Sequence, residues 1–422
     1  MTPRRPSRAA VPTPSPTAAL GRTRPWFERA FDPFWVVPAL WCLGAVVAAV
    51  LIPAVEGPAG RGVPLLFDGG PAAARNVLST IAGAMISVTG LVFSITIVVL
   101  QLASSQFSPR VLNTFLDDPV TQHTLGVFAS SFVYALTVLR AVRDAPADGE
   151  PFVPRLAVTV AYLLVLAAVG MFLAFIHHIT QSISVSTITH RVADQTRDLI
   201  ERSRPSGQVA GPRPELPDME HQTTVVAQRS GYLDSLDLQG LQRLARRRGA
   251  RLEVLYPLGS FLPEGAPAVM VRTQEPPGEG WDDDVAAGLG IARERTMHQD
   301  PTYGFRRLVD IAERALSPGI NDPTTAVQVI DELHDVLRRM AATADPWPVW
   351  YDEEGTPRLV TTEWTFAQYL DLAVDEIAHW GADGLQVPAR LREMLVDLQV
   401  VAGAEHRETV VAKLNRLGQT ER

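Results

Sequence analysis

The stretch SVTGLVFSITIVVLQLASSQFSPR, residues 87–110, decides the fold. It is apolar enough for the interior of a membrane, yet a polar residue returns at every seventh position: Ser87, Ser94, Gln101 and Ser108. Seven residues are almost two turns of an α-helix, so these side chains share one face. The sequence therefore predicts a membrane helix with a polar seam along its length.

Three further apolar blocks accompany this stretch, and all four precede residue 190. They cover about 34–55, 77–106, 121–139 and 156–189, and they contain no Asp, Glu, Lys or Arg. About 20 apolar residues cross the 30 Å hydrocarbon layer. Buried helices of a soluble protein do not account for this length and this lack of charge. We expect four transmembrane helices, the second and fourth of which are long enough to tilt or to continue past the membrane.

Arginines flank the membrane region on both sides. Residues 1–29 hold six arginines and one glutamate, a balance of +5 that leaves −13 for the rest of a chain with net charge −8. More arginines follow the fourth block, at Arg191, Arg197, Arg202 and Arg204. Basic residues favour the cytoplasmic side. This predicts a multi-pass protein of the inner membrane with both termini in the cytoplasm, although Arg140, Arg143 and Arg155 would then face outward.

The polar seam has two interpretations. Small and hydroxylated residues let membrane helices pack closely, or copies of this helix surround a water-filled pore with a hydrophobic gate. A long amide such as Gln101 needs a partner or water, which favours the pore. The predicted pore-lining residues are Ser87, Leu91, Ser94, Val98, Gln101, Ser105 and Ser108, and the predicted inner mouth carries Asp117 and Asp118. The blocks lack the ionisable groups that proton-coupled pumps use, so we expect a passive conduit.

The remaining chain has globular composition. We predict a disordered basic tail over 1–30, the four-helix membrane domain over 31–190, a linker over 191–222, a small β-rich module over 223–275 and a helical cytoplasmic domain over 276–422. The fold class is thus membrane α-helical with a cytoplasmic α+β domain, made of the β-rich module and a helical bundle. The segment around Trp347, Trp350 and Tyr351 reads as a loop.

The turn GSFLPEGAP, residues 259–267, resembles a turn of the barrel-sandwich domains related to lipoyl carriers. The lysine that would carry a lipoyl or biotinyl group is missing from this segment, so the resemblance implies a shape and no group transfer. We expect no cofactor and no metal. His177 and His178 are adjacent on a helix, where side chains diverge by about 100° and do not converge on one ion.

A dense polar set lies between residues 300 and 325: Asp300, Arg306, Arg307, Asp310, Asn321, Asp322, Thr324 and Thr325. It is either a ligand-binding site or a capped helical hairpin with internal salt bridges. Asn321 or Asp322 is expected to cap the second helix, with Pro323 in its first turn. No nucleotide-binding, zinc-spacing or nucleophile-elbow pattern occurs, so we expect no enzyme. A basic face for nucleic acid is also missing.

Several of these segments resemble one bacterial family. They are FSITIVVLQLASSQFSPRVL (93–112), FIHHI (175–179), the GSFLPEG turn (259–265) and ERTMHQDPTYGFRRLVDIAERALSPGINDPTTA (294–326). The chain resembles the predicted membrane proteins known as domain of unknown function number twenty-two fifty-four. The resemblance implies four membrane helices and a cytoplasmic domain, and it supplies neither an activity nor site residues.

Two functions fit the sequence. The first is a homo-oligomeric passive ion channel whose second helix lines the pore and whose cytoplasmic domain gates it, with the lipid bilayer, ions and copies of itself as partners. Asp117, Asp118 and the negative balance would favour cations. The alternative is a membrane-anchored sensor or scaffold, in which the seam is a packing surface and the polar hairpin binds a ligand or a partner protein.

Overall fold

A computed structural model of the chain describes residues 34–56, 66–106, 119–143, 152–182, 184–203, 216–345 and 348–420. The chain divides between Thr187 and Ile188 into two compact units. We call the first the membrane unit and the second, after its predicted location, the cytoplasmic unit, and we describe each by itself.

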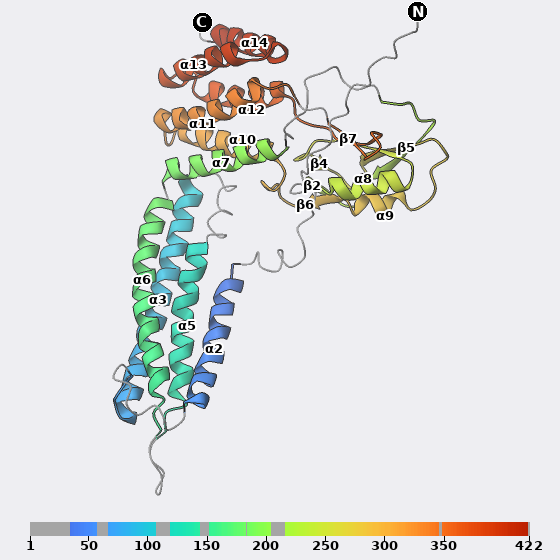
Figure 1. Cartoon of the computed structure of the whole chain (residues 1–422). Helices are drawn as coiled ribbons and strands as arrows, with labels where there is room; N and C mark the ends of the chain where they lie inside the picture. Colours follow the sequence, from blue (N-terminus) through green and yellow to red (C-terminus); the bar gives the residue numbers. More distant parts are fainter. Residues whose placement is uncertain are drawn as a thin grey trace, which may run out of the picture. The chain divides into compact units, whose positions relative to one another are not determined.

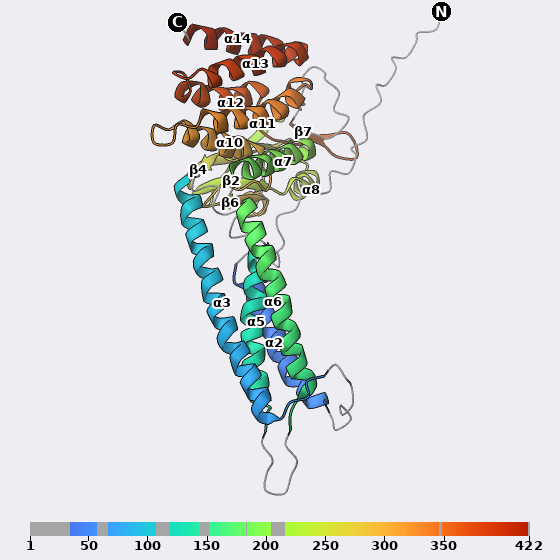
Figure 2. The same ribbon diagram turned by 90° about the vertical axis from the view of Figure 1, so that its left-hand side faces the viewer.

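Among the described residues, the membrane unit has four helices long and apolar enough to cross a bilayer, which confirms the predicted fold class. They are α2 (Val36–Val55), α3 (Pro71–Gln106), α5 (Pro119–Leu139) and α6 (Arg155–Ser182). They run side by side (Figures 1 and 2). At 1.5 Å per residue the 36 residues of α3 reach about 54 Å, well beyond the hydrocarbon layer.

Helix α5 is the central helix of this unit, because it contacts α2, α3 and α6. It is the least apolar of the four helices and the most buried. Its buried polar residues are Thr121, Gln122, Thr124, Ser130 and Ser131. The three neighbouring helices cover most of α5. It therefore tolerates hydroxyl groups that hydrogen-bond to its own backbone, as Ser131 Oγ does to the Val127 carbonyl at 2.7 Å.

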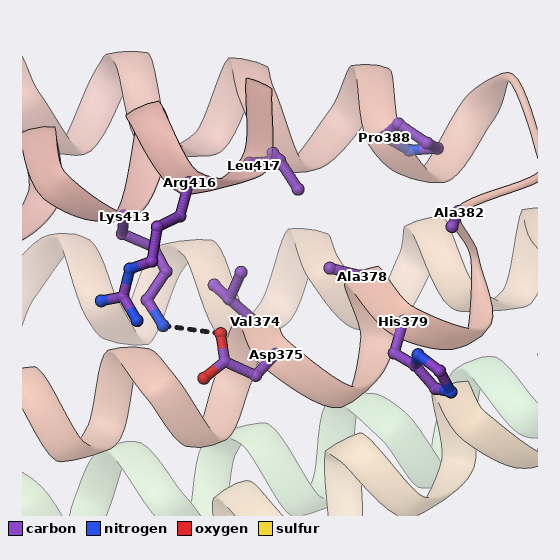
Figure 3. A pocket seen from close by; sticks show the side chains of 9 residues that line it. All are labelled: Val374, Asp375, Ala378, His379, Ala382, Pro388, Lys413, Arg416 and Leu417. Carbon is purple, nitrogen blue, oxygen red and sulfur yellow. Dashed lines mark hydrogen bonds and ion pairs between the residues drawn. The ribbon is translucent and has the colours of Figure 1, made fainter. Parts of the chain in front are cut away.

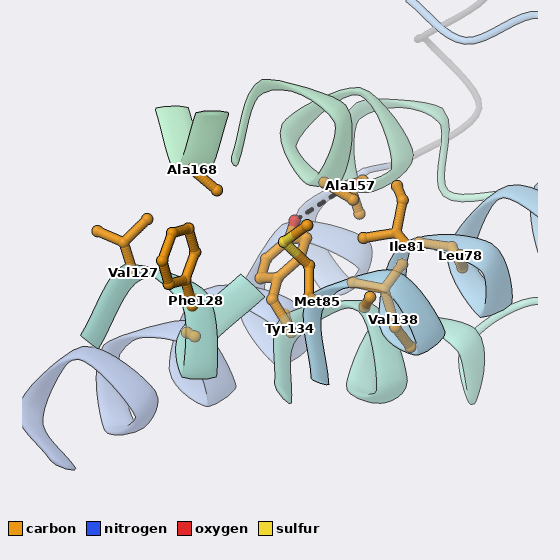
Figure 4. Packing of buried hydrophobic residues seen from close by; sticks show 14 of the residues in the cluster. Leu78, Ile81, Met85, Val127, Phe128, Tyr134, Val138, Ala157 and Ala168 are labelled. Atoms are coloured by element: carbon orange, nitrogen blue, oxygen red, sulfur yellow. Dashed lines mark hydrogen bonds between the residues drawn. The ribbon is translucent and has the colours of Figure 1, made fainter. Parts of the chain in front are cut away.

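An apolar core joins α3, α5 and α6 (Figure 4). Phe128 and Tyr134 of α5 are almost fully buried in it together with Leu78 of α3. The Tyr134 hydroxyl donates a 3.1 Å hydrogen bond to the Ala157 carbonyl in the first turn of α6. A tyrosine therefore occupies the core without leaving its polar atom unsatisfied.

Trp41 of helix α2 contacts helix α5. Trp41 Nε1 donates to His123 Nδ1 at 3.0 Å, and its ring lies against the backbone of Gly126, where any side chain would overlap it. The close approach of these two helices depends on a glycine at position 126.

The cytoplasmic unit begins inside α7 (Val185–Ser203), and this differs from the sequence prediction. Helix α6 ends at Ser182, and residues 191–203, which were predicted to be part of a linker, belong to α7. Their pattern is amphipathic: Val192, Leu199 and Ile200 are buried, while Arg191, Asp198 and Arg202 are exposed. Burial of that apolar side against the rest of the unit explains why the segment is helical.

Two sheets and two short helices form the β-rich module. The five-stranded sheet has the order β1-β5-β3-β8-β7 and the three-stranded sheet the order β4-β2-β6. The elements are β1 (His221–Val226), β2 (Gly231–Leu236), α8 (Leu238–Arg247), β3 (Arg251–Val254), β4 (Phe261–Leu262), β5 (Pro267–Thr273), α9 (Trp281–Ala286), β6 (Leu289–Ala292), β7 (Val349–Tyr351) and β8 (Pro357–Val360).

The module thus extends beyond the predicted residues 223–275. Strand β6 lies outside them, and the predicted loop around Trp350 and Tyr351 is a hairpin of β7 and β8. Strand β8 pairs in parallel with β3, about a hundred residues earlier in the chain. Strands of three or four residues carry too little local pattern to be recognised, and their pairing is decided by distant partners.

The helical bundle consists of α10 (Pro301–Leu316), α11 (Pro323–Ala341), α12 (Phe366–Trp380), α13 (Gln386–Val401) and α14 (Ala404–Thr420). These helices lie one upon another in both views (Figures 1 and 2). Their starts follow capping rules: Asp300, Asp322 and Thr365 accept hydrogen bonds from the first turns of α10, α11 and α12. Asn321 or Asp322 was predicted to cap the second helix, with Pro323 in its first turn; the cap is Asp322, and Pro323 follows it.

Candidate functional site

The polar seam of α3 lies on the exposed side of that helix. Ser87, Ser94 and Gln101 are exposed. On the opposite side Val92 and Val99 are buried in the membrane unit. The other three described helices of the membrane unit therefore leave the seam open, and within the described residues of this unit it is no packing surface.

Two apolar residues accompany the exposed seam. Leu91 is 53% exposed and Val98 is 52% exposed. The backbone of α3 includes Ser105, whose side chain lies outside the described residues. Ser108, Asp117 and Asp118 also lie outside them, so the predicted inner mouth has no described geometry.

The seam hydroxyls bond to the helix that carries them. Ser87 Oγ donates to the Gly83 carbonyl and Ser94 Oγ to the Gly90 carbonyl, both at 2.9 Å. Each oxygen keeps acceptor capacity that can face water or a neighbouring helix. The exposed amide of Gln101 adds two donors and an acceptor.

The polar set of the cytoplasmic unit begins with a helix cap that is also an ion pair. Asp300 is buried, caps α10 through the Tyr303 amide, and accepts from Arg295 Nη2 at 2.7 Å. Gly259, with φ of +85°, lies against both charged groups and has no room for a side chain. Gly259 begins the GSFLPEG turn, so this turn fits against the start of α10.

Arg306 lies at the centre of three carboxylates from two helices. Its guanidinium contacts Asp310 at 2.5 Å and Glu313 at 2.7 Å within α10, and Glu376 of α12 at 2.5 Å. Burial and a hydrogen bond with Glu376 raise the pKa of Glu313 to about 7, although Arg306 opposes the shift. Glu313 and Glu376 were not among the predicted site residues. The spacing of Arg306, Asp310 and Glu313 on one helix face could have revealed Glu313, but nothing local points to Glu376.

Of the remaining predicted residues, Arg307 and Asp322 have structural partners. Arg307 is buried, donates to the Met297 sulfur at 3.1 Å, and has a pKa lowered by burial. Asp322 accepts from the Thr325 hydroxyl at 2.6 Å, which lowers its pKa. Thr324 is exposed. Asn321 is exposed with φ of +49°, the one positive φ at a residue other than glycine in the described part of the chain. Most of this set thus forms caps and ion pairs, Asn321 and Thr324 are exposed, and the cavity described below among the described residues is lined by none of the set.

Helix α7 is tied to α11 by charges that the sequence did not single out. Arg197 Nε lies 2.9 Å from Asp335 Oδ2, and Arg197 also lies 3.7 Å from Glu332. His190 contacts the same Glu332 at 2.5 Å, and Arg339 of α11 reaches back to Glu201 at 3.2 Å. Since α7 directly follows the last membrane helix in the chain, these contacts hold the first element of the cytoplasmic unit on its bundle.

A cavity of about 280 Å³ opens between α12, α13 and α14 (Figure 3). Lys413, the only lysine of the chain, is buried beside it with its Nζ 2.6 Å from Asp375 Oδ1 and in contact with Asp371. Val374, Ala378, Ala382, Pro388 and Leu417 form its apolar lining, and Arg416 and His379 also border it. The two aspartates balance the charge of Lys413 and Arg416, so the cavity selects no sign of ligand charge.

One group of residues in the described part of the chain has the composition of a metal site: Asp345, Glu405 and His406. Two of its members already have structural partners. Asp345 accepts from the Phe366 amide at the start of α12, at 3.1 Å, and His406 Nε2 lies 2.9 Å from the Thr343 carbonyl. Asp345 and His406 thus bind backbone groups at the ends of neighbouring helices. Asp345 lies 60 positions before Glu405, so the sequence shows no metal-ligand spacing.

Comparison with known proteins places this architecture among membrane proteins. Residues 32–397 match the family described as "Predicted membrane protein (DUF2254)". The chain is 33% identical over 395 residues to two uncharacterized proteins, Rv1290c of Mycobacterium tuberculosis and Mb1321c of Mycobacterium bovis. Each match covers 92% of this chain and 75% of the relative. No solved structure matches the chain.

Proposed function

The chain belongs to the DUF2254 family of predicted membrane proteins, and we propose that it forms a homo-oligomeric passive ion channel whose pore is lined by α3. One observation carries the proposal. The polar seam of α3 is exposed, while the opposite face of the same helix packs on the rest of the membrane unit. A polar face that its own subunit does not cover can line a water-filled axis at the centre of an oligomer.

The amide of Gln101 argues against a seam that faces lipid. A polar side chain in hydrocarbon is costly unless it meets a partner or water. Copies of α3 around an axis would give Gln101, Ser87 and Ser94 a common aqueous path. Leu91 and Val98, beside the seam, form the apolar constriction at which such a path can dewet and close.

Passive conduction follows from the charges of the spans. Helices α2 and α5 contain no Asp, Glu, Lys or Arg, and neither does α3 beyond Arg75 or α6 beyond Arg155. Such spans offer no carboxylate relay for coupled transport. Asp117, Asp118 and the negative balance outside the tail give a preference for cations. In this proposal the cytoplasmic unit gates the pore and catalyses no reaction.

The orientation is part of the same proposal. The arginines of residues 1–29 and those after α6 favour the cytoplasmic side, so both termini face the cytoplasm and the channel lies in the inner membrane.

A membrane-anchored sensor or scaffold is the second candidate. It is favoured by the hydroxyls of Ser87 and Ser94, which bond to the carbonyls of their own helix and therefore need no water. Small residues of this kind also serve as contacts between membrane helices. The seam would then join subunits without a pore.

The deciding experiment is a flux assay on the purified protein in liposomes, combined with its particle mass. The channel requires salt-gradient-driven ion flux that falls in Gln101→Leu while the particle mass is unchanged. Tyr162→Leu, at an exposed position of α6, is the matched control and should conduct like the unaltered protein. Normal flux in Gln101→Leu would exclude the seam from the pore. No flux in any variant, with loss of the oligomer in Gln101→Leu, would support the scaffold.

A further inference from the structure

The cavity between α12, α13 and α14 has a charged end. Lys413 and Arg416 of α14 lie there with Asp375 of α12, and the exposed His379 lies at the opposite end (Figure 3). The lining between the two ends is apolar. The volume of about 280 Å³ is just below the range of about 300–1000 Å³ that is common for pockets of drug-sized ligands. The cavity therefore suits a molecule of the size of an amino acid.

Lys413 keeps one hydrogen-bond donor for a ligand. Its side chain is 3% exposed, whereas the two carboxylates that hold it, Asp371 and Asp375, are 47% and 56% exposed. An ammonium group has three N–H donors. Two of them meet these aspartates, and no other residue in the described part of the chain accepts the third. Because Lys413 borders the cavity, a ligand there can accept it.

Opposite charges lie side by side at the charged end. Lys413 and Arg416 carry two positive charges, Asp371 and Asp375 carry two negative ones, and Arg416 lies 3.9 Å from Asp371. A plain anion would meet the two carboxylates, and a plain cation would meet the ammonium and guanidinium groups. A zwitterion offers each group an opposite charge and adds no net charge. Since Lys413 Nζ and Asp375 Oδ1 are 2.6 Å apart, the two ligand charges must be close together, as they are when one carbon atom carries both.

We propose that the cavity binds a small zwitterion of the α-amino-acid class with an apolar side chain of the size of leucine's. Its carboxylate accepts hydrogen bonds from Lys413 and Arg416, and its ammonium group donates to Asp375. Its side chain packs on Val374 and Leu417, which removes apolar surface from water. The site lies within the cytoplasmic unit and does not depend on a pore along α3, so it adds ligand binding to the proposed function and can be tested separately.

Isothermal titration calorimetry of the full-length protein in detergent micelles tests the class of ligand. L-leucine should bind with one molecule per chain. Three analogues each lack one part of leucine: glycine lacks the apolar side chain, isocaproate lacks the ammonium group and isoamylamine lacks the carboxylate. Each analogue should bind at least about tenfold more weakly than leucine. If leucine does not bind at about 10 mM, or if one of the analogues binds as tightly as leucine, the proposal is wrong.

Two variants test whether leucine binds in this cavity. Arg416→Gln removes an exposed charge from the charged end, and Ala378→Leu fills part of the apolar lining. Both should weaken the binding of leucine by about tenfold or more. Arg407→Gln is the matched control and should bind leucine like the unaltered protein. Arg407 is exposed and lies nine residues before Arg416, which places it on the opposite side of α14 at about 100° per residue.

The thermal midpoint without leucine shows whether the variants are folded. If Ala378→Leu is not, Arg416→Gln alone decides, because its side chain is 64% exposed in the folded protein. Unchanged leucine affinity in the folded variants would place the ligand elsewhere and overturn the proposal. Leucine binding without ion flux would support this site and contradict only the channel.

Discussion

The hydroxyl of Thr196 in α7 lies directly against the α-carbon of Gly304 in α10, where even a methyl group would overlap it. Thr196 is fully buried and donates a 2.6 Å hydrogen bond to the Val192 carbonyl of its own helix. The helix that follows the last membrane span is thus fitted to the bundle through a glycine.

Gly304→Ala should destabilise the cytoplasmic unit. Alanine in a helix interior is normally more stable than glycine by about 1 kcal/mol, but here its methyl group forces α7 away from α10, and overpacking costs about 1–3 kcal/mol. The thermal midpoint of the full-length protein should fall. Gly418→Ala, at a helical glycine with open space around it, is the control and should leave the midpoint equal or higher. A higher midpoint in Gly304→Ala would show that α7 does not approach α10 this closely.

Gly259→Ala should destabilise more than Gly265→Ala. Both glycines belong to the GSFLPEG turn and have φ near +80°, so alanine is strained at either position. Only Gly259 also contacts Asp300 and Arg295, whereas the space beside Gly265 is open. The unfolding free energy of Gly259→Ala should be lower than that of Gly265→Ala by about 1–3 kcal/mol. This difference measures the cost of the contact between the new methyl group and the Asp300–Arg295 ion pair. Equal losses would attribute the whole effect to backbone strain.

Glu313→Gln should stabilise the protein above neutral pH and have little effect below about pH 4.5. The folded protein raises the pKa of Glu313 from 4.5 to about 7 through burial and the hydrogen bond with Glu376. The folded state therefore binds the proton more tightly, and this group makes stability fall as pH rises from about 4.5 to about 7. Glutamine imitates the protonated form and removes that loss. Thermal midpoints between about pH 4 and pH 8.5 would show it, with exposed Glu408→Gln as the control. If the difference in thermal midpoint between Glu313→Gln and the unaltered protein is the same at every pH, the folded protein does not raise the pKa of Glu313.

Val98→Ser should increase ion leak through reconstituted protein if Val98 belongs to a hydrophobic gate. A hydroxyl at the constriction favours water and lowers the barrier to wetting. Leu173→Ser, at a 64% exposed position of α6, should leave the flux unchanged because it is not on the seam. The measurement is the rate of flux per particle. Equal rates for Val98→Ser and the unaltered protein would place the gate elsewhere.

The sequence by itself determined the membrane helices and the main caps of the bundle. Hydrophobic length and the absence of charge are properties of consecutive residues, so α2, α3, α5 and α6 could be recognised without any knowledge of their neighbours. The cap at Asp322 is likewise a local matter of an acceptor side chain followed by proline.

Only the tertiary structure decided what these elements face. The parallel pairing of β8 with β3, the contact of Glu376 with Arg306 and the bonds of Arg197 to α11 join residues far apart in the chain. The polar seam could be located from its spacing, but whether it is covered depends on which side of α3 meets α5 and α6. Packing resolves that choice, because Val92, opposite the seam, lies in the core of the membrane unit, and Ser87, Ser94 and Gln101 are left exposed.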